Sequence, residues 1–435
     1  MKKCIFTGSL LLTALLFVTP TDAKIAWSEP EVLFTGQFND KPNISVNELN
    51  QAIVIWSQRI EDKEQARTIL YSDGWQENVK CSPRIQRYVM HPQVSLNNWG
   101  HAIAVWQKYG LEQSSLRVAK YADGAWGESI SKLLIPHGQG NMANLDIALN
   151  DAENGVAICL NQSSESDILR ACEYENGEWK EIQSISSKFV TFRGENPRIR
   201  NVKLSMNDVG DKMLVWDMFN GTHSRIIASH KMQNSEDWSD PQVISPVLCA
   251  KAGRIESPHV AFNNNGLAIA VWRVYAEKSL IGMATFAAGM WSEPTIATSE
   301  HVGWITPSVA LNNLDHAMII WHANDQLYAQ SRINGTWNQA QVISQSGWSP
   351  NDHQLILNDL DQAVVIYNAS EVIETTMPFP PAPPTYGFVA TFAEGKWDCP
   401  VRISPRVLDV GLNLNGKAFV LGQEGDALKA TCGHF

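Results

Sequence analysis

Residues 91–106 read HPQVSLNNWGHAIAVW, two short apolar runs joined by a tight polar turn. The same pattern returns as SPHVAFNNNGLAIAVW at residues 257–272 and as TPSVALNNLDHAMIIW at residues 306–321. Weaker copies surround five further turn asparagines, namely Asn47, Asn150, Asn207, Asn358 and Asn413. Copies spaced by about 50 residues indicate a repeat architecture, either a solenoid or a propeller.

The repeat unit predicts four short antiparallel strands. In the second unit they cover residues 93–96, 101–107, 116–121 and 125–133. Asn97 and Gly100 suit the turn between the first two strands, because asparagine tolerates left-handed dihedrals and glycine adopts a positive φ freely. Asp123-Gly124 is a hairpin dipeptide ahead of the fourth strand. Units of this kind are typical of propeller blades.

Tryptophans in the fourth strands decide the number of blades. They are Trp75, Trp126, Trp179, Trp238, Trp291, Trp337 and Trp397. An eighth copy, Trp27, precedes any first strand, whereas the last unit stops after its third strand. We therefore predict an all-β, eight-bladed β-propeller in which residues 24–36 complete the last blade and remove its exposed edge. Seven blades, the alternative, would leave one unit unplaced. The predicted blades cover approximately residues 41–84, 90–135, 143–188, 198–246, 257–298, 305–345, 350–404 and 406–435.

The N-terminal residues 1–23 have the pattern of a secretory signal peptide. Lys2 and Lys3 precede the apolar run at residues 10–18, and the small residue Ala23 stands at the expected cleavage site. The run is too short to span a bilayer, so we expect no membrane insertion. The alternative is a buried N-terminal strand. We expect residues 24–435 to form a single exported domain, periplasmic or extracellular.

The charge and the cysteine content limit the partners that we expect for this protein. The formal net charge is −11, and lysine and arginine do not cluster, which argues against nucleic acid as a ligand. Cys159 and Cys172 lie on two runs joined by a polar loop, so an exported chain could join them by a disulfide across a hairpin. No cysteine or histidine spacing is typical of a metal site, and we expect no cofactor. We expect a monomer that binds a glycan or a protein.

One polar position recurs at the start of each first strand, near the predicted channel mouth. It is occupied by Asn43, Gln93, Asp146, Lys203, His259, Ser308, Gln354 and Asp409. Because function in a repetitive framework lies in what departs from the repeat, these side chains are candidate ligand contacts. The alternative is a solvated channel lining.

Two irregular features occur in loops on the same predicted face. Trp304 and Trp348 lie outside the regular tryptophan positions, and they either stack on a sugar ring or cap the core under a loop. Trp99 is also irregular but falls in a turn on the opposite face. The long loop of the seventh unit favours polyproline geometry, which suits a lid, a partner-docking arm or a spacer. Its candidate docking residues are Phe379, Pro380, Pro381, Pro383 and Pro384.

The repeat resembles a propeller repeat of exported bacterial proteins over nearly the whole chain after residue 23. Its motif is Pro-x-Val-x-x-Asn-x-x-Gly-x-Ala-x-x-Val-Trp, followed by Gly-x-Trp-Ser-x-Pro. More distantly, it is similar to fucose-specific lectin and sialidase-superfamily propellers. The sialidase Asp-box is matched only in part, for example by Ser72-Asp73-Gly74-Trp75, and the arginine triad and tyrosine nucleophile of that superfamily have no assignable positions.

No catalytic motif was found, whether Gly-x-Ser-x-Gly, His-Glu-x-x-His or a phosphate loop, so no catalytic residue is assigned. Our first hypothesis is a non-catalytic binding module that recognises a glycan or a protein through its loop face. The second is an envelope scaffold for protein assembly. The third is a divergent sialidase-like glycoside hydrolase that uses a channel-mouth carboxylate such as Asp146 or Asp409.

Overall fold

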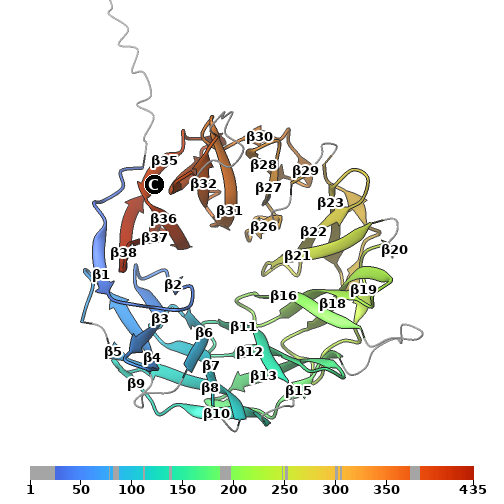
Figure 1. The fold of residues 1–435 in the computed structure, drawn as a ribbon. Helices are drawn as coiled ribbons and strands as arrows, with labels where there is room; N and C mark the ends of the chain where they lie inside the picture. Colours follow the sequence, from blue (N-terminus) through green and yellow to red (C-terminus); the bar gives the residue numbers. More distant parts are fainter. Residues whose placement is uncertain are drawn as a thin grey trace, which may run out of the picture.

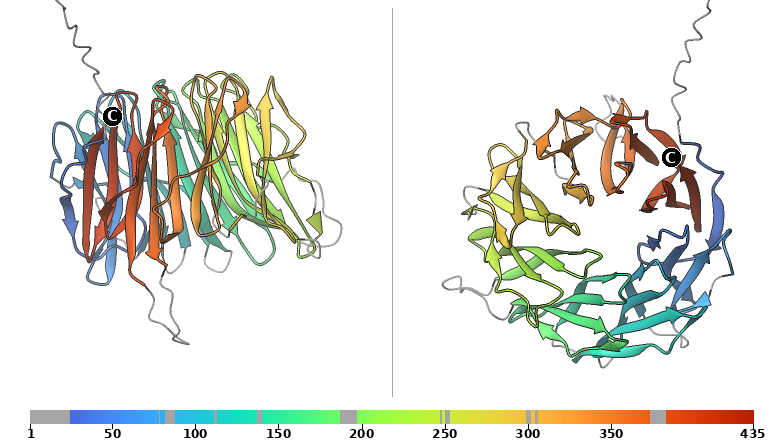
Figure 2. Two further views of the ribbon diagram at one scale, coloured as in Figure 1. Left: turned by 90° about the horizontal axis from the view of Figure 1, so that it is seen from above. Right: turned by 180° about the vertical axis from the view of Figure 1, so that it is seen from behind.

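In the computed structural model, eight small antiparallel sheets form a ring around a common axis, an eight-bladed β-propeller (Figure 1; Figure 2). The prediction of eight blades rather than seven is confirmed. The structure describes residues 25–77, 79–81, 88–110, 113–136, 140–186, 197–246, 248–249, 253–298, 302–303, 306–372 and 383–435. The predicted signal peptide lies outside these residues. No helix within them is long and apolar enough to cross a membrane.

Each blade is named blade 1 to blade 8 in the order of its innermost strand. The innermost strands are β2 (Asn43–Val46), β6 (Tyr88–Leu96), β11 (Asn141–Leu149), β16 (Arg198–Met206), β21 (Arg254–Phe262), β26 (Ser308–Leu311), β31 (Trp348–Leu357) and β36 (Arg406–Leu412). The second strands are β3 (Ala52–Ile60), β7 (Ala102–Tyr109), β12 (Gly155–Gln162), β17 (Lys212–Phe219), β22 (Ala268–Tyr275), β27 (Ala317–Ala323), β32 (Ala363–Glu371) and β37 (Lys417–Glu424). The third strands are β4 (Lys63–Tyr71), β8 (Gln113–Ala122), β13 (Asp167–Glu175), β18 (His223–Lys231), β23 (Leu280–Ala287), β28 (Gln326–Ile333), β33 (Thr385–Ala393) and β38 (Ala427–His434).

Short outer strands complete the blades. They are β1 (Glu31–Thr35), β5 (Val79–Lys80), β9 (Ala125–Trp126), β10 (Ile130–Pro136), β14 (Glu178–Trp179), β15 (Gln183–Ser184), β19 (Gln242–Val243), β20 (Leu248–Cys249), β24 (Met290–Trp291), β25 (Thr295–Ile296), β29 (Thr336–Trp337), β30 (Gln341–Val342), β34 (Lys396–Trp397) and β35 (Val401–Ser404). In most blades the outer edge is divided between two such strands, which both pair with the third strand.

The core consists of layers between neighbouring blades rather than one central cluster. The second strands are buried on both faces, as their nearly continuous apolar runs require. Their largest side chains are buried as predicted: Trp56, Trp106, Trp216, Trp272, Trp321 and Tyr367. One layer, for example, joins Met213 and Val215 of blade 4 to Ile255 and Trp272 of blade 5. Each blade is therefore stabilised by its two neighbours, which makes the closure of the ring important.

The ring closes between the two ends of the chain, as predicted. Strand β1 pairs antiparallel with β38, from Glu31 opposite Ala430 to Thr35 opposite Ala427. Leu33 of this strand is buried against the core layer that blades 8 and 1 share. The closing strand therefore completes a sheet and also fills the core between the first and last blades.

A second closed structure runs around the axis at the turns between first and second strands. The Nδ2 atom of each turn asparagine donates to a backbone carbonyl in the turn of the next blade, over 2.8 to 3.3 Å. The eight members are Asn47, Asn97, Asn150, Asn207, Asn263, Asn312, Asn358 and Asn413, and each is at most 5% exposed. We call this set the asparagine ring. Because Asn413 donates to the carbonyl of Asn47, the ring is closed, and the repeated turn also joins each blade to the next by a hydrogen bond.

The innermost strands carry a further regular feature at their other ends. Six of them contain a β-bulge just ahead of the recurring polar position: β6, β11, β16, β21, β31 and β36. A bulge bends the strand and changes the direction in which the following side chains point. The other two, β2 and β26, are only four residues long and begin at the polar position.

Candidate functional site

The recurring polar position first serves to bind neighbouring blades together. Asn43 Oδ1 accepts from the backbone N–H of Val94 (2.9 Å), and Asp409 Oδ2 accepts from that of Ile44 (2.9 Å). His259 Nδ1 accepts in the same way from the next blade's Val309 (3.4 Å). In each of these three side chains, one polar atom is thus already used to join neighbouring blades.

A cavity of about 590 Å³ opens beside five of the predicted positions. Its walls come from blades 4 to 8 and from Lys41 ahead of blade 1, and we call it the channel-mouth cavity. The five residues of the predicted set that line it are Lys203, His259, Ser308, Gln354 and Asp409. Asn43, Gln93 and Asp146 do not line it.

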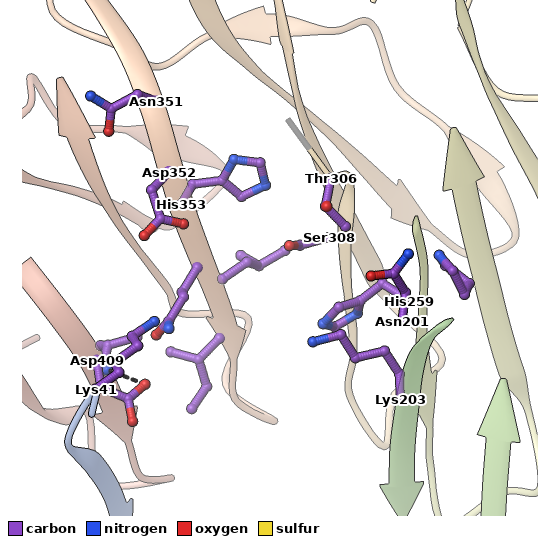
Figure 3. A pocket seen from close by; sticks show the side chains of 15 residues that line it. Lys41, Asn201, Lys203, His259, Thr306, Ser308, Asn351, Asp352, His353 and Asp409 are labelled. Carbon is purple, nitrogen blue, oxygen red and sulfur yellow. Dashed lines mark hydrogen bonds between the residues drawn. The ribbon is translucent and has the colours of Figure 1, made fainter. Parts of the chain in front are cut away.

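The cavity lies beside blade 6, whose innermost strand β26 is short. This strand pairs only with Ala317–Ile320 of β27, so the following residues Trp321 and His322 have no partner on it. The neighbouring innermost strands β21 and β31 extend further, over nine and ten residues. Between blades 5 and 7, Thr306 and Ser308 face the cavity (Figure 3).

Three histidines gather at this side of the ring. His353 projects from β31 toward the cavity, opposite His259 and Lys203 (Figure 3). His353 is 7% exposed, and neither of its ring nitrogens has a hydrogen-bond partner among the described residues. The same is true of the ring nitrogens of the neighbouring His322. A buried imidazole without a hydrogen-bond partner is costly, and this sets the two rings apart from the other described histidines.

Burial keeps the histidines neutral. It lowers the pKa of His353 to about 3, and the nearby His322 lowers it further in the same direction. Burial also lowers the pKa of His259 to about 3, with Lys203 and His353 adding to the effect. A neutral imidazole has one donor and one acceptor nitrogen. Because His259 Nδ1 already accepts from Val309 N–H, the Nε2–H group of His259 is the one left for a polar ligand.

The two lysines of the cavity differ in their surroundings. Lys41 is held by the Gln354 side chain, whose amide nitrogen donates to Asp409 Oδ1 (2.6 Å) in the orientation its neighbours favour. Lys203 forms no ion pair with any residue that the structure describes. It interacts electrostatically with Asp146, whose pKa burial raises to about 6. Lys203 therefore places in the cavity wall a positive charge that could meet an anionic ligand.

Several sequence predictions fall elsewhere. Trp348 packs edge-on against Tyr386 and Phe388, with ring centroids 5.5 and 5.2 Å away, and so covers the core of blade 7. Trp304 and the loop residues Phe379, Pro380 and Pro381 lie outside the described residues. Pro383 and Pro384 immediately precede β33 and do not line the cavity.

Cys159 and Cys172 are free thiols in the structure. They occupy adjacent strands, but Cys159 lies opposite Arg170 and Cys172 opposite Ala157, so the two are offset diagonally by two residues. The predicted disulfide is not formed. In the described part of the chain, no three histidine, cysteine or acidic side chains are arranged to hold a metal ion.

Sequence reasoning missed Lys41, Asn201 and His322 as parts of this region. His322 directly follows the regular Trp321, a position where Gln107 and Asp217 are also polar. A comparison of this position between the repeats could therefore have identified His322. Nothing in the sequence marks Asn201, which adopts a positive φ in the bulge of β16 and donates to Asp217 Oδ1 over 2.7 Å.

The neutral histidines predict a particular pH dependence of stability. In the unfolded chain His353 takes up a proton below about pH 6.5, whereas in the folded protein it does so only near pH 3. Because the unfolded chain takes up this proton more readily than the folded protein does, the folded protein loses stability as the pH falls from about 6.5 to about 3. Asp146 and Asp217, whose pKa values burial raises to about 6, act in the opposite direction over pH 6 to 4.

We expect the His353→Gln variant to lose less stability than the wild type when the pH is lowered from 7 to 4.5. Urea unfolding at both pH values measures this difference. His434→Gln, at an exposed position far along the chain, is the matched control. An equal loss in His353→Gln and wild type would show that the His353 ring is not held neutral.

The fold and the cavity together define a class: an eight-bladed propeller with a polar, partly cationic cavity at one channel mouth. No family model matches this sequence, and no curated protein matches it significantly. Among solved structures, the chain is similar to the polysaccharide lyase Uly1, with 10% identity, a TM-score of 0.51 and coverage of 79% of this chain and 88% of the lyase. It is also similar to the Hadza microbial sialidase Hz136, with 11% identity, a TM-score of 0.43 and coverage of 71% of each chain. A third is the α-L-arabinofuranosidase Arb93A of Fusarium graminearum, with 12% identity, a TM-score of 0.41 and coverage of 73% and 97%. At these identities the likeness concerns the fold alone.

Proposed function

We propose that this protein is an exported, non-catalytic binding module that takes an acidic saccharide at the channel-mouth cavity. The observation that carries the proposal is that polar residues line two opposite walls of the cavity. His353 on one wall faces His259 and Lys203 on the other (Figure 3). The cavity volume of about 590 Å³ lies within the range of small-molecule sites, roughly 300–1,000 Å³.

The chemistry of the walls favours a sugar that carries a carboxylate. The Lys203 ammonium supplies a charge-assisted hydrogen bond, which is stronger than a neutral one. The Nε2–H group of the neutral His259 ring offers a hydrogen-bond donor for a hydroxyl group, and the neutral His353 ring lines the opposite wall. Asn201 and Asp352 at the rim add amide and carboxylate groups of the kind that hydrogen-bond sugar hydroxyls.

The carboxylates beside the channel support binding rather than hydrolysis. A glycosidase uses two carboxyl groups that both face the bond to be cleaved. Asp409 lines the cavity, but it accepts from Asn43, from Ile44 N and from Val410 N. Asp146 accepts from Ile147 N (2.9 Å) and does not line the cavity. Both groups are thus committed to the framework, which leaves the exposed Asp352 alone.

Two of the similar propellers are named as a sialidase and a polysaccharide lyase. Their likeness to this chain is one of fold, and the proposal rests on the cavity. The lyase defines the activity that a test has to look for, because elimination at a uronate would leave an unsaturated product.

We expect Lys203→Gln to weaken binding of an acidic oligosaccharide about tenfold, since a hydrogen bond to a charged group contributes about 1.5–3 kcal/mol. A glycan array with residues 24–435 selects the ligand, and calorimetry measures its affinity. Raising the salt concentration should weaken binding to the wild type and have less effect on the variant. The matched control is Lys396→Gln, an exposed lysine on the outer strand β34.

Equal affinity for acidic and neutral oligosaccharides would overturn the assignment of the ligand class. Equal affinity of the Lys203→Gln and wild-type proteins would overturn the site. Release of an unsaturated or reducing product during the incubation would show that the module is an enzyme.

A further inference from the structure

We propose a second binding site, on the face that carries the asparagine ring, which takes a neutral sugar ring against Trp99. The turns between first and second strands lie at the opposite ends of the innermost strands from the channel-mouth cavity. A hollow of about 300 Å³ opens there between blades 1 and 2, and Trp99 lines it. We call it the Trp99 hollow. It shares no residue with the channel-mouth cavity, so the inference does not rest on the function proposed above.

Trp99 departs from its seven equivalents in the other turns. The residue two places after the turn asparagine is Leu49, Ala152, Val209, Asn265, Leu314, Leu360 or Asn415 in the other blades. Trp99 is the aromatic member of this set, and it is 70% exposed. Large apolar surface that is left in water, rimmed by polar groups, marks a place where something binds.

The indole of Trp99 is also held in a fixed orientation. Its Nε1–H donates to the backbone carbonyl of Asp151 in the next blade, over 2.7 Å. The turn that carries it is anchored by Asn97, whose Oδ1 accepts from the N–H groups of Trp99 (3.1 Å) and His101 (3.0 Å). An aromatic ring that is already ordered loses little entropy when a ligand stacks on it.

The rest of the hollow is polar around an aromatic base. Tyr71 and Tyr121 contribute rings, and Gln51, Gln76, His101 and Asp123 contribute hydrogen-bonding groups. His101 is positioned through its Nδ1, which contacts Glu153, and Glu153 is itself paired with Lys120 (2.8 Å). This leaves Nε2 as the His101 atom that can meet a ligand.

A sugar ring matches this combination better than an apolar side chain does. Its C–H face stacks on an aromatic ring while its hydroxyl groups point outward to amide, imidazole and carboxylate partners. A volume of 300 Å³ is at the lower end of the range for small-molecule sites and suits a single ring. The carboxylate of Asp123 lines the hollow and disfavours an anionic ligand, so the sugar is neutral, in contrast to the one proposed for the channel-mouth cavity.

The test uses residues 24–435 labelled with 5-fluorotryptophan and titrated with the methyl glycosides of glucose, galactose, mannose and fucose. Trp99→Phe assigns the Trp99 fluorine resonance. We expect at least one glycoside to shift this resonance in a saturable manner. Trp99→Ala should weaken its binding at least tenfold in saturation-transfer measurements, and Trp99→Phe less.

Leu49→Ala is the matched control, because Leu49 occupies the equivalent position in blade 1 and is 60% exposed. Melting curves of the three variants show whether each is folded. Lys203→Gln should leave the glycoside titration unchanged, which separates this site from the channel-mouth cavity. No shift of the Trp99 resonance with any of the four glycosides would overturn the proposal, and so would undiminished binding by a folded Trp99→Ala variant.

Discussion

Removing residues 25–35 is expected to abolish cooperative unfolding and to leave a chain that aggregates. These residues contain β1, the outer strand of the last blade, and without it the long strand β38 exposes an unpaired edge. Such edges pair with other chains. The deletion also opens the core layer between blades 8 and 1, in which Leu33 packs with Phe419 and Leu428.

A milder version of the same experiment separates the core contact from the strand pairing. Leu33→Ala should lower the free energy of unfolding by about 3 kcal/mol, as is usual for a buried leucine. Val32→Ala, at a 57% exposed position of the same strand, should have a much smaller effect. Urea unfolding of both variants and gel filtration of the deletion test the prediction. A deletion that melts like the wild type would show that the ring does not need its closing strand.

The second large effect is expected at the asparagine ring. Asn263 donates from Nδ2 to the carbonyl of Asn312 (2.8 Å) and to Asp315 Oδ1 (2.7 Å). Its Oδ1 accepts from the N–H groups of Asn265 and Leu267 (both 3.1 Å). Asn263→Ala removes all four hydrogen bonds of a buried side chain, which should lower the free energy of unfolding by about 3 kcal/mol.

Asn263→Asp tests the donor hydrogen bonds more specifically, because it keeps the acceptor oxygen and loses the donor. Its carboxylate would face the Asn312 carbonyl and Asp315, so the fold raises the pKa of the introduced group. A raised carboxyl pKa contributes stability below the unfolded value that is lost as the pH rises through the folded value. We therefore expect the Asp variant to be strongly destabilised at pH 7 and partly recovered at pH 4.5.

Urea unfolding at the two pH values measures this recovery. The control is Asn234→Asp, an exposed asparagine outside the ring. If Asn263→Ala and Asn263→Asp were as stable as the wild type, the ring would be a consequence of the fold and not a source of its stability.

The turn asparagines illustrate how much of the fold is predictable. Their recurrence, the alternating apolar runs and the solitary Trp27 were enough to predict eight blades and the closing strand. The reason is that each blade repeats the same local chemistry, so eight weak signals support one another. What recurrence could not reveal is that the Nδ2 atom reaches the next blade, because this contact joins residues about 50 positions apart.

The site was less predictable, for a physical reason. Lys203, His259, Gln354 and Asp409 were identified because they occupy one repeated position. Whether such residues line a cavity, however, depends on how neighbouring blades pack, which the sequence of one blade does not show. Trp348 illustrates a different difficulty. A tryptophan outside the repeated positions can either contact a ligand or cover the core, and only its packing against Phe388 distinguishes these two roles.

The pairing of β1 with β38 also imposes an order on the steps of folding. The strand that completes the ring is synthesised about 400 residues before its partner. Closing a loop of this length costs roughly 5 kcal/mol of chain entropy, which the other blades reduce by folding first and bringing β1 and β38 together. Until β38 has been synthesised, β1 has no sheet to join and stays unpaired.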